Sequence, residues 1–233
     1  APAAARNQAK RDHGTADTRA RLEEFRERGS SLAAKHPGAE GIMVVDEGWF
    51  TLTADLRHRY RYHFVGLVLN EARLDWAKIE LGFTEGRSRQ EITYARCLSA
   101  DGTVHVLYPD DVQVSTPGRG AVHFDPNGRV LTATVPGADV GSVIEYEYEY
   151  EAYAPEDWRL FFPGFYFQSD VPVGRSAMTV RVPGGIPLYF WEENWPDRGG
   201  DGWLTRLGLR RPSRAERSTE ILEGVEYDLY RWV

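Results

Sequence analysis

The 233-residue chain has 42% hydrophobic and 27% charged residues, a composition typical of a folded globular protein rather than a disordered one. Its 28 lysine and arginine residues and 35 aspartate and glutamate residues give a net charge of −7, which argues against the broad positive field of a nucleic-acid-binding protein. The sequence also contains no run of about 20 apolar residues, so no membrane span is expected.

The N-terminal part of the chain predicts an extended arm followed by one helix. Residues 1–14 are polar, of mixed charge and without an apolar period, which is typical of a linker. In residues 15–35, Leu22, Phe25 and Leu32 fall on one helical stripe. A helix this short is marginal in water without tertiary contacts, so we expect it to lie against the rest of the protein, over a sheet edge or one end of a sandwich.

From Ile42 onward the apolar period changes from helical to strand-like. Segments rich in Val, Ile, Tyr, Phe and Trp alternate with turn residues, and we predict strands at 42–53, 57–69, 76–83, 89–98, 103–108, 129–135, 142–152, 175–182, 186–192, 216–222 and 225–232. About eleven strands with almost no helix between them predict a mostly β fold, an antiparallel β-sandwich or large open barrel with one N-terminal helix. We expect two parts: a linker and helix over 1–36, and a single large β-domain over 37–233.

The segment 144–151 alternates glutamate with tyrosine after an initial isoleucine. On a strand the tyrosines share one face and the four glutamates share the other. The simplest interpretation places the tyrosines on the core and the glutamates in water; the alternative is a glutamate surface for a cation or a basic partner. Residues 198–217 are locally basic and contain Arg198, Arg206, Arg210, Arg211, Arg214 and Arg217. This segment is either a solvated loop or a surface that pairs with the glutamates, within the chain or across an interface.

The sequence offers little for catalysis. Cys97 is the single cysteine, which excludes an intrachain disulfide, and it lies in a predicted strand where no helix N-terminus lowers its pKa. We therefore expect a buried small apolar residue rather than a nucleophile. His58 and His63 are an odd number of positions apart on one strand, so they face opposite sides and cannot share a metal ion unless a bulge intervenes. No cofactor, metal site or catalytic residue is predicted.

Aromatic residues are the remaining candidates for recognition. Residues 158–167 contain more rings than one face of one strand can hold, and further rings follow near 189–203. Large rings commonly fill a wide β core, whereas rings in loops can form an exposed platform for a glycan, a peptide or an adjoining domain. The candidate ligand or partner surface comprises Trp158, Phe161, Phe162, Trp195, Trp203, Arg210 and Arg211.

Several segments together carry a family resemblance. They are 37–40, 42–48, 61–71, 99–102, 108–112, 135–146 (VPGADVGSVIEY) and 165–173 (FYFQSDVPV), of which the last two are the most specific. In this order they resemble a bacterial domain of unknown function, number 3857 of that series, which precedes transglutaminase-like domains in exported proteins. The resemblance covers roughly 36–192. It implies an all-β accessory domain without catalytic residues, whose Cys-His-Asp machinery lies in a downstream domain.

These observations leave three functional hypotheses. The first is a non-catalytic domain that packs on a downstream transglutaminase-like domain or positions substrate for it. The second is a free-standing carbohydrate- or peptide-binding module, and the third is a structural subunit that assembles through strand edges. The opening residues 1–5 (APAAA) are compatible with the end left after signal-peptide removal, so a periplasmic or secreted protein is expected.

Overall fold

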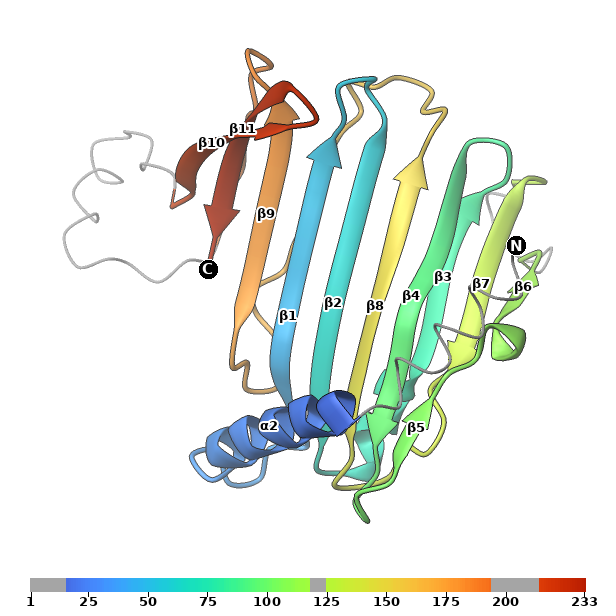
Figure 1. Ribbon diagram of the computed structural model, residues 1–233, viewed down its shortest axis with the longest axis vertical. Helices are drawn as coiled ribbons and strands as arrows, with labels where there is room; N and C mark the ends of the chain where they lie inside the picture. The colour runs from blue at the N-terminus through green and yellow to red at the C-terminus, as the bar shows by residue number, and fades with distance from the viewer. Residues whose placement is uncertain (1–15, 118–124, 194–213) are drawn as a thin grey trace.

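The computed structural model describes residues 16–117, 125–193 and 214–233 (Figure 1). The described chain contains the α-helix α2 (Ala16–Ala33), two short 3₁₀ helices, η1 (Glu71–Ala77) and η2 (Pro109–Asp111), and eleven strands. The strands are β1 (Gly41–Leu52), β2 (His58–Val68), β3 (Lys78–Thr84), β4 (Ser88–Leu98), β5 (Val104–Val106), β6 (Gln113–Ser115), β7 (Gly128–Thr134), β8 (Val143–Ala152), β9 (Ser176–Pro183), β10 (Glu216–Leu222) and β11 (Val225–Trp232). The mostly β fold with one N-terminal helix is confirmed.

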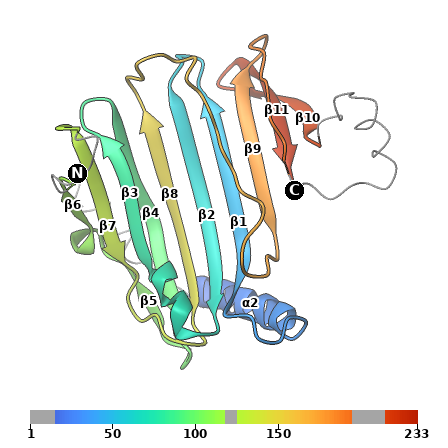
Figure 2. The same ribbon diagram turned by 180° about the vertical axis from the view of Figure 1, so that it is seen from behind.

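The strands form two open sheets. The large sheet has the order β10-β11-β9-β1-β2-β8-β4-β5, and the small sheet has the order β3-β7-β6. Figure 2 shows the small sheet at the β4 side of the large sheet, with β3 next to β4, and residues of the two sheets share one hydrophobic core. The arrangement is sandwich-like and neither sheet closes into a barrel. We call the side that carries the small sheet the back face, and the opposite side the front face.

One strand pair differs from the expected antiparallel pattern. β1 and β9 are parallel, from the pair Asp46–Ser176 to the pair Thr51–Arg181. The reason is the connection that precedes β9. Residues 153–175 return along the back face to the end of the sheet where β1 begins, so β9 then runs in the same direction as β1 (Figure 2). The remaining strand pairs of both sheets are antiparallel.

Two predictions of strands failed in opposite ways. Residues 186–192 were predicted as a strand, but they are assigned to neither sheet. They lie instead against the core with Ile186, Leu188 and Phe190 turned inward, so packing produced the strand-like alternation without strand pairing. β6 was not predicted, because its three residues are too short to show an alternation.

The core of the back face has two parts. The first lies between the sheets, where residues such as Ala95 and Ile144 of the large sheet pack with Ile79 and Leu131 of the small sheet. The second lies over β1, β9 and β11. There the described strands of the small sheet contribute no residue to the core, and the extended segments 158–167 and 186–190 cover Leu52, Met178, Val180, Val182 and Trp232.

On the front face, α2 lies across one end of the large sheet and contacts β1, β2, β4 and β8 (Figure 1). Leu22 is fully buried and Phe25 is 7% exposed, while Leu32 is only partly buried. Gly29 permits the close approach, because a Cβ atom there would lie 3.0 Å from Leu67 Cδ2. The helix therefore covers one end of a sheet face rather than a sheet edge. Among the described residues, no helix is long and apolar enough to cross a membrane.

Candidate interaction surfaces

The alternating segment of β8 places its side chains as the sequence predicts. The register of β8 with β2 pairs Glu145 with Val65 and Glu151 with Arg59, both on the front face, while the tyrosines lie beside Phe64 and Tyr62 on the back face. The expectation that all four glutamates are in water is wrong, however. Glu145 and Glu151, the two ends of this glutamate ladder, are buried. The rest of the ladder is Glu147 and Glu149.

Glu145 is fully buried beneath α2 and is surrounded by nitrogen donors of one histidine and two arginines. Its carboxylate lies 2.9 Å from His63 Nε2, 2.7 Å from Arg96 Nε and 3.0 Å from Arg21 Nη2, the last contributed by the helix. Burial raises the pKa of this carboxyl group, but the hydrogen bond from His63 and the charges of Arg96 and Arg21 outweigh burial, so its pKa lies below the usual range. This end of the ladder holds the helix on the sheet.

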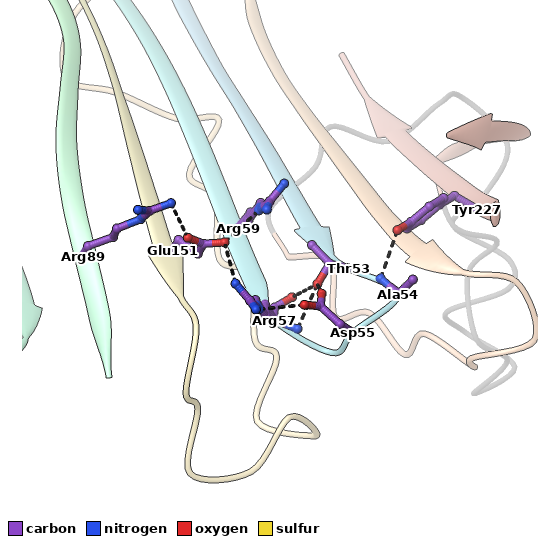
Figure 3. Close-up of polar contacts among 8 residues, drawn as sticks. All are labelled: Thr53, Ala54, Asp55, Arg57, Arg59, Arg89, Glu151 and Tyr227. Carbon is purple, nitrogen blue, oxygen red and sulfur yellow. Dashed lines mark hydrogen bonds and ion pairs between the residues drawn. The ribbon is translucent and has the colours of Figure 1, made fainter. Parts of the chain in front are cut away.

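Glu151 has a similar set of partners but no cover. Arg89 Nη2 lies 2.7 Å from its carboxylate, Arg59 Nε 3.1 Å and Arg57 Nη1 3.8 Å (Figure 3). The Glu151 side chain is 8% exposed, whereas those of Arg89 and Arg59 are 69% and 60% exposed. Arg57 also bonds Asp55 at 2.7 Å. One buried carboxylate thus fixes two solvent-exposed guanidinium groups, one on each side of it.

Two adjoining hollows, of about 410 Å³ and 500 Å³, occupy the front face away from α2. Both are lined by Trp49 and Arg181. The first also contains the guanidinium of Arg61, which lies 4.1 Å from the centre of the Trp49 ring, and the carboxylates of Glu149 and Glu91. We call this first hollow the front groove. It combines an indole platform with fixed charges of both signs.

The predicted aromatic segment divides into an inner and an outer set. Trp158 and Phe161 are partly buried on the back-face core, where His58 Nε2 hydrogen-bonds the carbonyl oxygen of Trp158 at 2.9 Å and the His58 ring lies 5.3 Å from the Phe161 ring. Phe162 points outward and is 82% exposed. Of these three predicted surface residues, Phe162 alone is fully presented to solvent.

Three further rings share the exposure of Phe162 and were missed from the sequence. Tyr166 is 90% exposed, Tyr189 84% and Trp191 81%. The sequence does contain a pattern that could have found them, because inward and outward residues alternate in both 161–167 and 186–191. The inward residues of the two segments pack on the core cluster of β9 and β11; they are Phe165, Phe167, Leu188 and Phe190. We call Phe162, Tyr166, Tyr189 and Trp191 the aromatic ridge, since both segments lie on the same core cluster.

The other predicted surface residues, Trp195, Trp203, Arg210 and Arg211, lie outside the described residues. Of the arginine-rich run, Arg217 lies on β10, with its guanidinium 5.7 Å from the Phe190 ring centre and 5.3 Å from that of Tyr230. The arginines that contact the buried glutamates come from α2, β4 and the region of β2 instead. The sequence did not predict these pairings, because the partners are far apart along the chain.

Cys97 has the environment of a structural residue. It is fully buried, and burial raises the pKa of its thiol to about 11. Its Sγ donates a hydrogen bond to the carbonyl oxygen of Gly137 at 3.4 Å. A thiol with a raised pKa and no access to solvent is a poor nucleophile. Across 16–117, 125–193 and 214–233, no group of three or more His, Cys, Asp or Glu residues is arranged to hold a metal ion.

A family model described as a domain of unknown function with a solved structure, DUF3857, matches residues 54–201. A search of curated proteins gives no match. Among solved structures, a "putative protease" from Parabacteroides distasonis superimposes with a TM-score of 0.56 and 16% identity. The similarity covers 83% of this chain but 35% of that protein, so the chain spans about a third of its length.

Two other solved structures are more distant. A CBM3a-L domain of the scaffoldin CipA from the Clostridium thermocellum cellulosome gives a TM-score of 0.29 and 10% identity over 52% of this chain and 71% of its own. An M1 zinc metallopeptidase from Deinococcus radiodurans gives 0.32 and 9% over 84% of this chain and 40% of its own. Similarities this low in shape and sequence carry no functional inference.

Proposed function

Because the chain belongs to the DUF3857 family of domains of unknown function, we propose that it is a non-catalytic accessory domain of a larger exported protein. In this proposal it docks on a transglutaminase-like domain encoded after Val233 and positions substrate for that domain. The fold similarity to the Parabacteroides distasonis protein supports a modular role, since the shared fold makes up 35% of that longer chain.

The aromatic ridge is the observation that carries the proposal. Each of its four rings is more than 80% exposed, although alternate residues of the same segments are packed on the core. Fully burying one such side chain contributes about 1.5–3 kcal/mol. Large exposed aromatic groups on an ordered support are typical of a protein-binding surface, where Trp and Tyr supply much of the binding energy.

The chemistry of the described residues supports an accessory role. Cys97 is sealed in the core with a raised pKa, and the best-formed constellations of charged side chains are arginine–glutamate clusters rather than a nucleophile with a base. Catalysis by the parent protein would then belong to another domain. The accessory domain would contribute affinity and orientation.

The proposal is tested by reading the parent coding sequence beyond Val233 and producing the domain found there. Binding of that domain to this chain is measured by isothermal titration calorimetry. Trp191→Ser and Phe162→Ser should each weaken binding at least tenfold, the effect of removing about 1.4 kcal/mol of interface energy. Tyr108→Ser is the matched control, because Tyr108 is 45% exposed but lies beside η2, away from the ridge.

Two results would overturn the proposal: no transglutaminase-like domain in the reading frame, or equal binding by the ridge variants and the control.

The exposed rings also favour a second candidate function, carbohydrate binding, because aromatic faces stack on apolar ring surfaces. This candidate predicts that the wild-type chain is retained on an immobilised polysaccharide and that Trp191→Ser is not. If only this second result is obtained, the glycan-binding function replaces the first.

A further inference from the structure

We propose that the front groove binds a short peptide with a lysine at its free carboxyl terminus. The peptide carboxylate is held by Arg59 and Arg89, and the ammonium group of its side chain by Glu149 and Glu91. The groove lies on the front face, opposite the core that supports the aromatic ridge, so this site goes beyond the docking function.

The proposed binding of the peptide carboxylate depends on guanidinium N–H groups that are not used in the contacts with Glu151. Glu151 accepts contacts from three guanidinium groups, and Arg57 is also paired with Asp55. Arg59 and Arg89 each have five N–H donors, and Figure 3 shows that they reach Glu151 from opposite sides. Their remaining donors are free for a ligand because the two side chains are 60% and 69% exposed. Planar guanidinium groups fixed in this way suit a carboxylate.

The ammonium end rests on two carboxylates that face each other. Glu91 of β4 and Glu149 of β8 are directly paired in register. Like charges in this position destabilise a sheet. Arg61, the register partner of Glu149 on β2, lies over the Trp49 ring, and no ion pair joins Glu149 or Glu91 to another described residue. A ligand cation would relieve this repulsion.

The spacing of the two ends defines the ligand. Arg59 and Arg61 are two positions apart on β2, so the row that contains Arg59, Glu151 and Arg89 lies about 7 Å from the row that contains Glu149 and Glu91. The four-carbon stem of a lysine separates its ammonium group from its own carboxylate by a comparable length. The volume of the groove, about 410 Å³, is within the range of small-ligand sites.

The test uses the whole chain labelled with ¹⁵N and the peptide acetyl-Ala-Ala-Lys with a free carboxyl terminus, followed by chemical-shift titration. We expect shifts confined to β2, β4, β8 and the Trp49 indole. The carboxyl-terminal amide of the peptide, and the peptide with an acetylated lysine side chain, should each bind at least tenfold more weakly, since each lacks one of the two charges. Equal binding of all three peptides, or no shifts in these strands, would overturn the proposal.

Substitutions then assign the two ends. Arg59→Gln should weaken the parent peptide at least tenfold but leave the amide peptide unchanged, and Glu149→Gln should weaken the parent peptide but not the acetyl-lysine peptide. Arg159→Gln is the control, because Arg159 pairs with Asp157 outside the groove. If a groove variant fails to fold, the three peptides on the wild-type chain still decide the question. Trp191→Ser should bind the peptide normally, so failure here is distinguishable from failure of ridge docking.

Discussion

Both ends of the glutamate ladder on β8 hold a buried carboxylate among basic side chains, but the basic side chains differ in exposure. At one end Glu145 meets His63 and Arg96, whose side chains are 9% and 8% exposed, and Arg21 of α2, whose side chain is 48% exposed. At the other end Glu151 meets three arginines whose side chains are 43% to 69% exposed. The helix makes the difference, because it covers the first cluster and does not reach the second (Figure 1).

This difference assigns different roles to similar chemistry. Charges removed from water must be fully paired, so the cluster at Glu145 is tied to the stability of the fold. Ion pairs whose cations remain in water contribute little, typically no more than about 1 kcal/mol, so the exposed arginines around Glu151 add little stability and keep donors available for a ligand. The mostly buried cluster is a structural element, and the open cluster is the surface on which the peptide site is proposed.

The largest expected contrast comes from removing the charge at each end in turn. Glu145→Gln should lower the free energy of unfolding by about 3–5 kcal/mol, because Arg96 is left buried without its counter-charge. Glu151→Gln should cost about 1 kcal/mol or less, because its arginine partners turn to water. Urea denaturation measures both. Equal losses at the two ends would contradict the distinction.

The next largest effect concerns the packing of helix α2 on the sheet. Leu22→Ala should cost about 2–5 kcal/mol, because Leu22 is fully buried between α2 and the sheet. Glu24→Ala on the exposed side of the same helix is the control and should change the stability by less than about 0.5 kcal/mol. Thermal unfolding of both variants checks the prediction. If Leu22→Ala unfolds like Glu24→Ala, the helix does not hold the cluster closed.

A smaller effect is the pH dependence that Glu145 contributes. Its pKa in the folded protein is below the ordinary value, so the unfolded chain binds the proton more tightly. The stabilisation is therefore present above the unfolded pKa, about 4.3, and is lost as the pH falls through the lower folded value. Asp46 has the opposite sign, because burial raises its pKa despite hydrogen bonds from Tyr62 and Ser176. Its destabilising effect therefore appears as the pH rises.

Unfolding free energies of the wild type and Glu145→Gln, measured from pH 3 to pH 7, isolate the Glu145 contribution. The difference between the two proteins should shrink as the pH falls below about 4.3. A difference that stays constant over this range would show that Glu145 is not held ionised by its partners.

The smallest expected effect is that of Cys97→Ser. The hydroxyl can donate to the Gly137 carbonyl oxygen as the thiol does, so we expect a loss of about 1 kcal/mol in unfolding free energy. Every binding property described above should be unchanged. Loss of a measurable activity with the fold preserved would instead make Cys97 a functional residue.

What the sequence could predict follows from local periodicity. The alternation in β8 correctly placed glutamates and tyrosines on opposite faces. Boundaries of β1, β2 and β9 also agree with the prediction to within one residue. Each of these features depends on neighbours in the chain.

What it could not predict depends on distant contacts. The burial of Glu145 follows from Arg21 and Arg96, which only the fold brings together. The alternation in 186–192 reports packing on a core, and no local pattern distinguishes that from strand pairing. The ridge was missed for the same reason, since Tyr166 and Trp191 are recognisable as exposed only once their inward neighbours are placed.

Hydrogen exchange on the isolated chain, with and without the transglutaminase-like domain proposed to follow Val233, tests the docking function most directly. Protection should increase in 160–167 and 186–192, the segments that carry the aromatic ridge, while α2 and the sheet beneath it remain unchanged. Protection confined to α2 or β10, or no change in any segment at saturating partner concentration, would contradict an accessory domain that docks through its aromatic ridge.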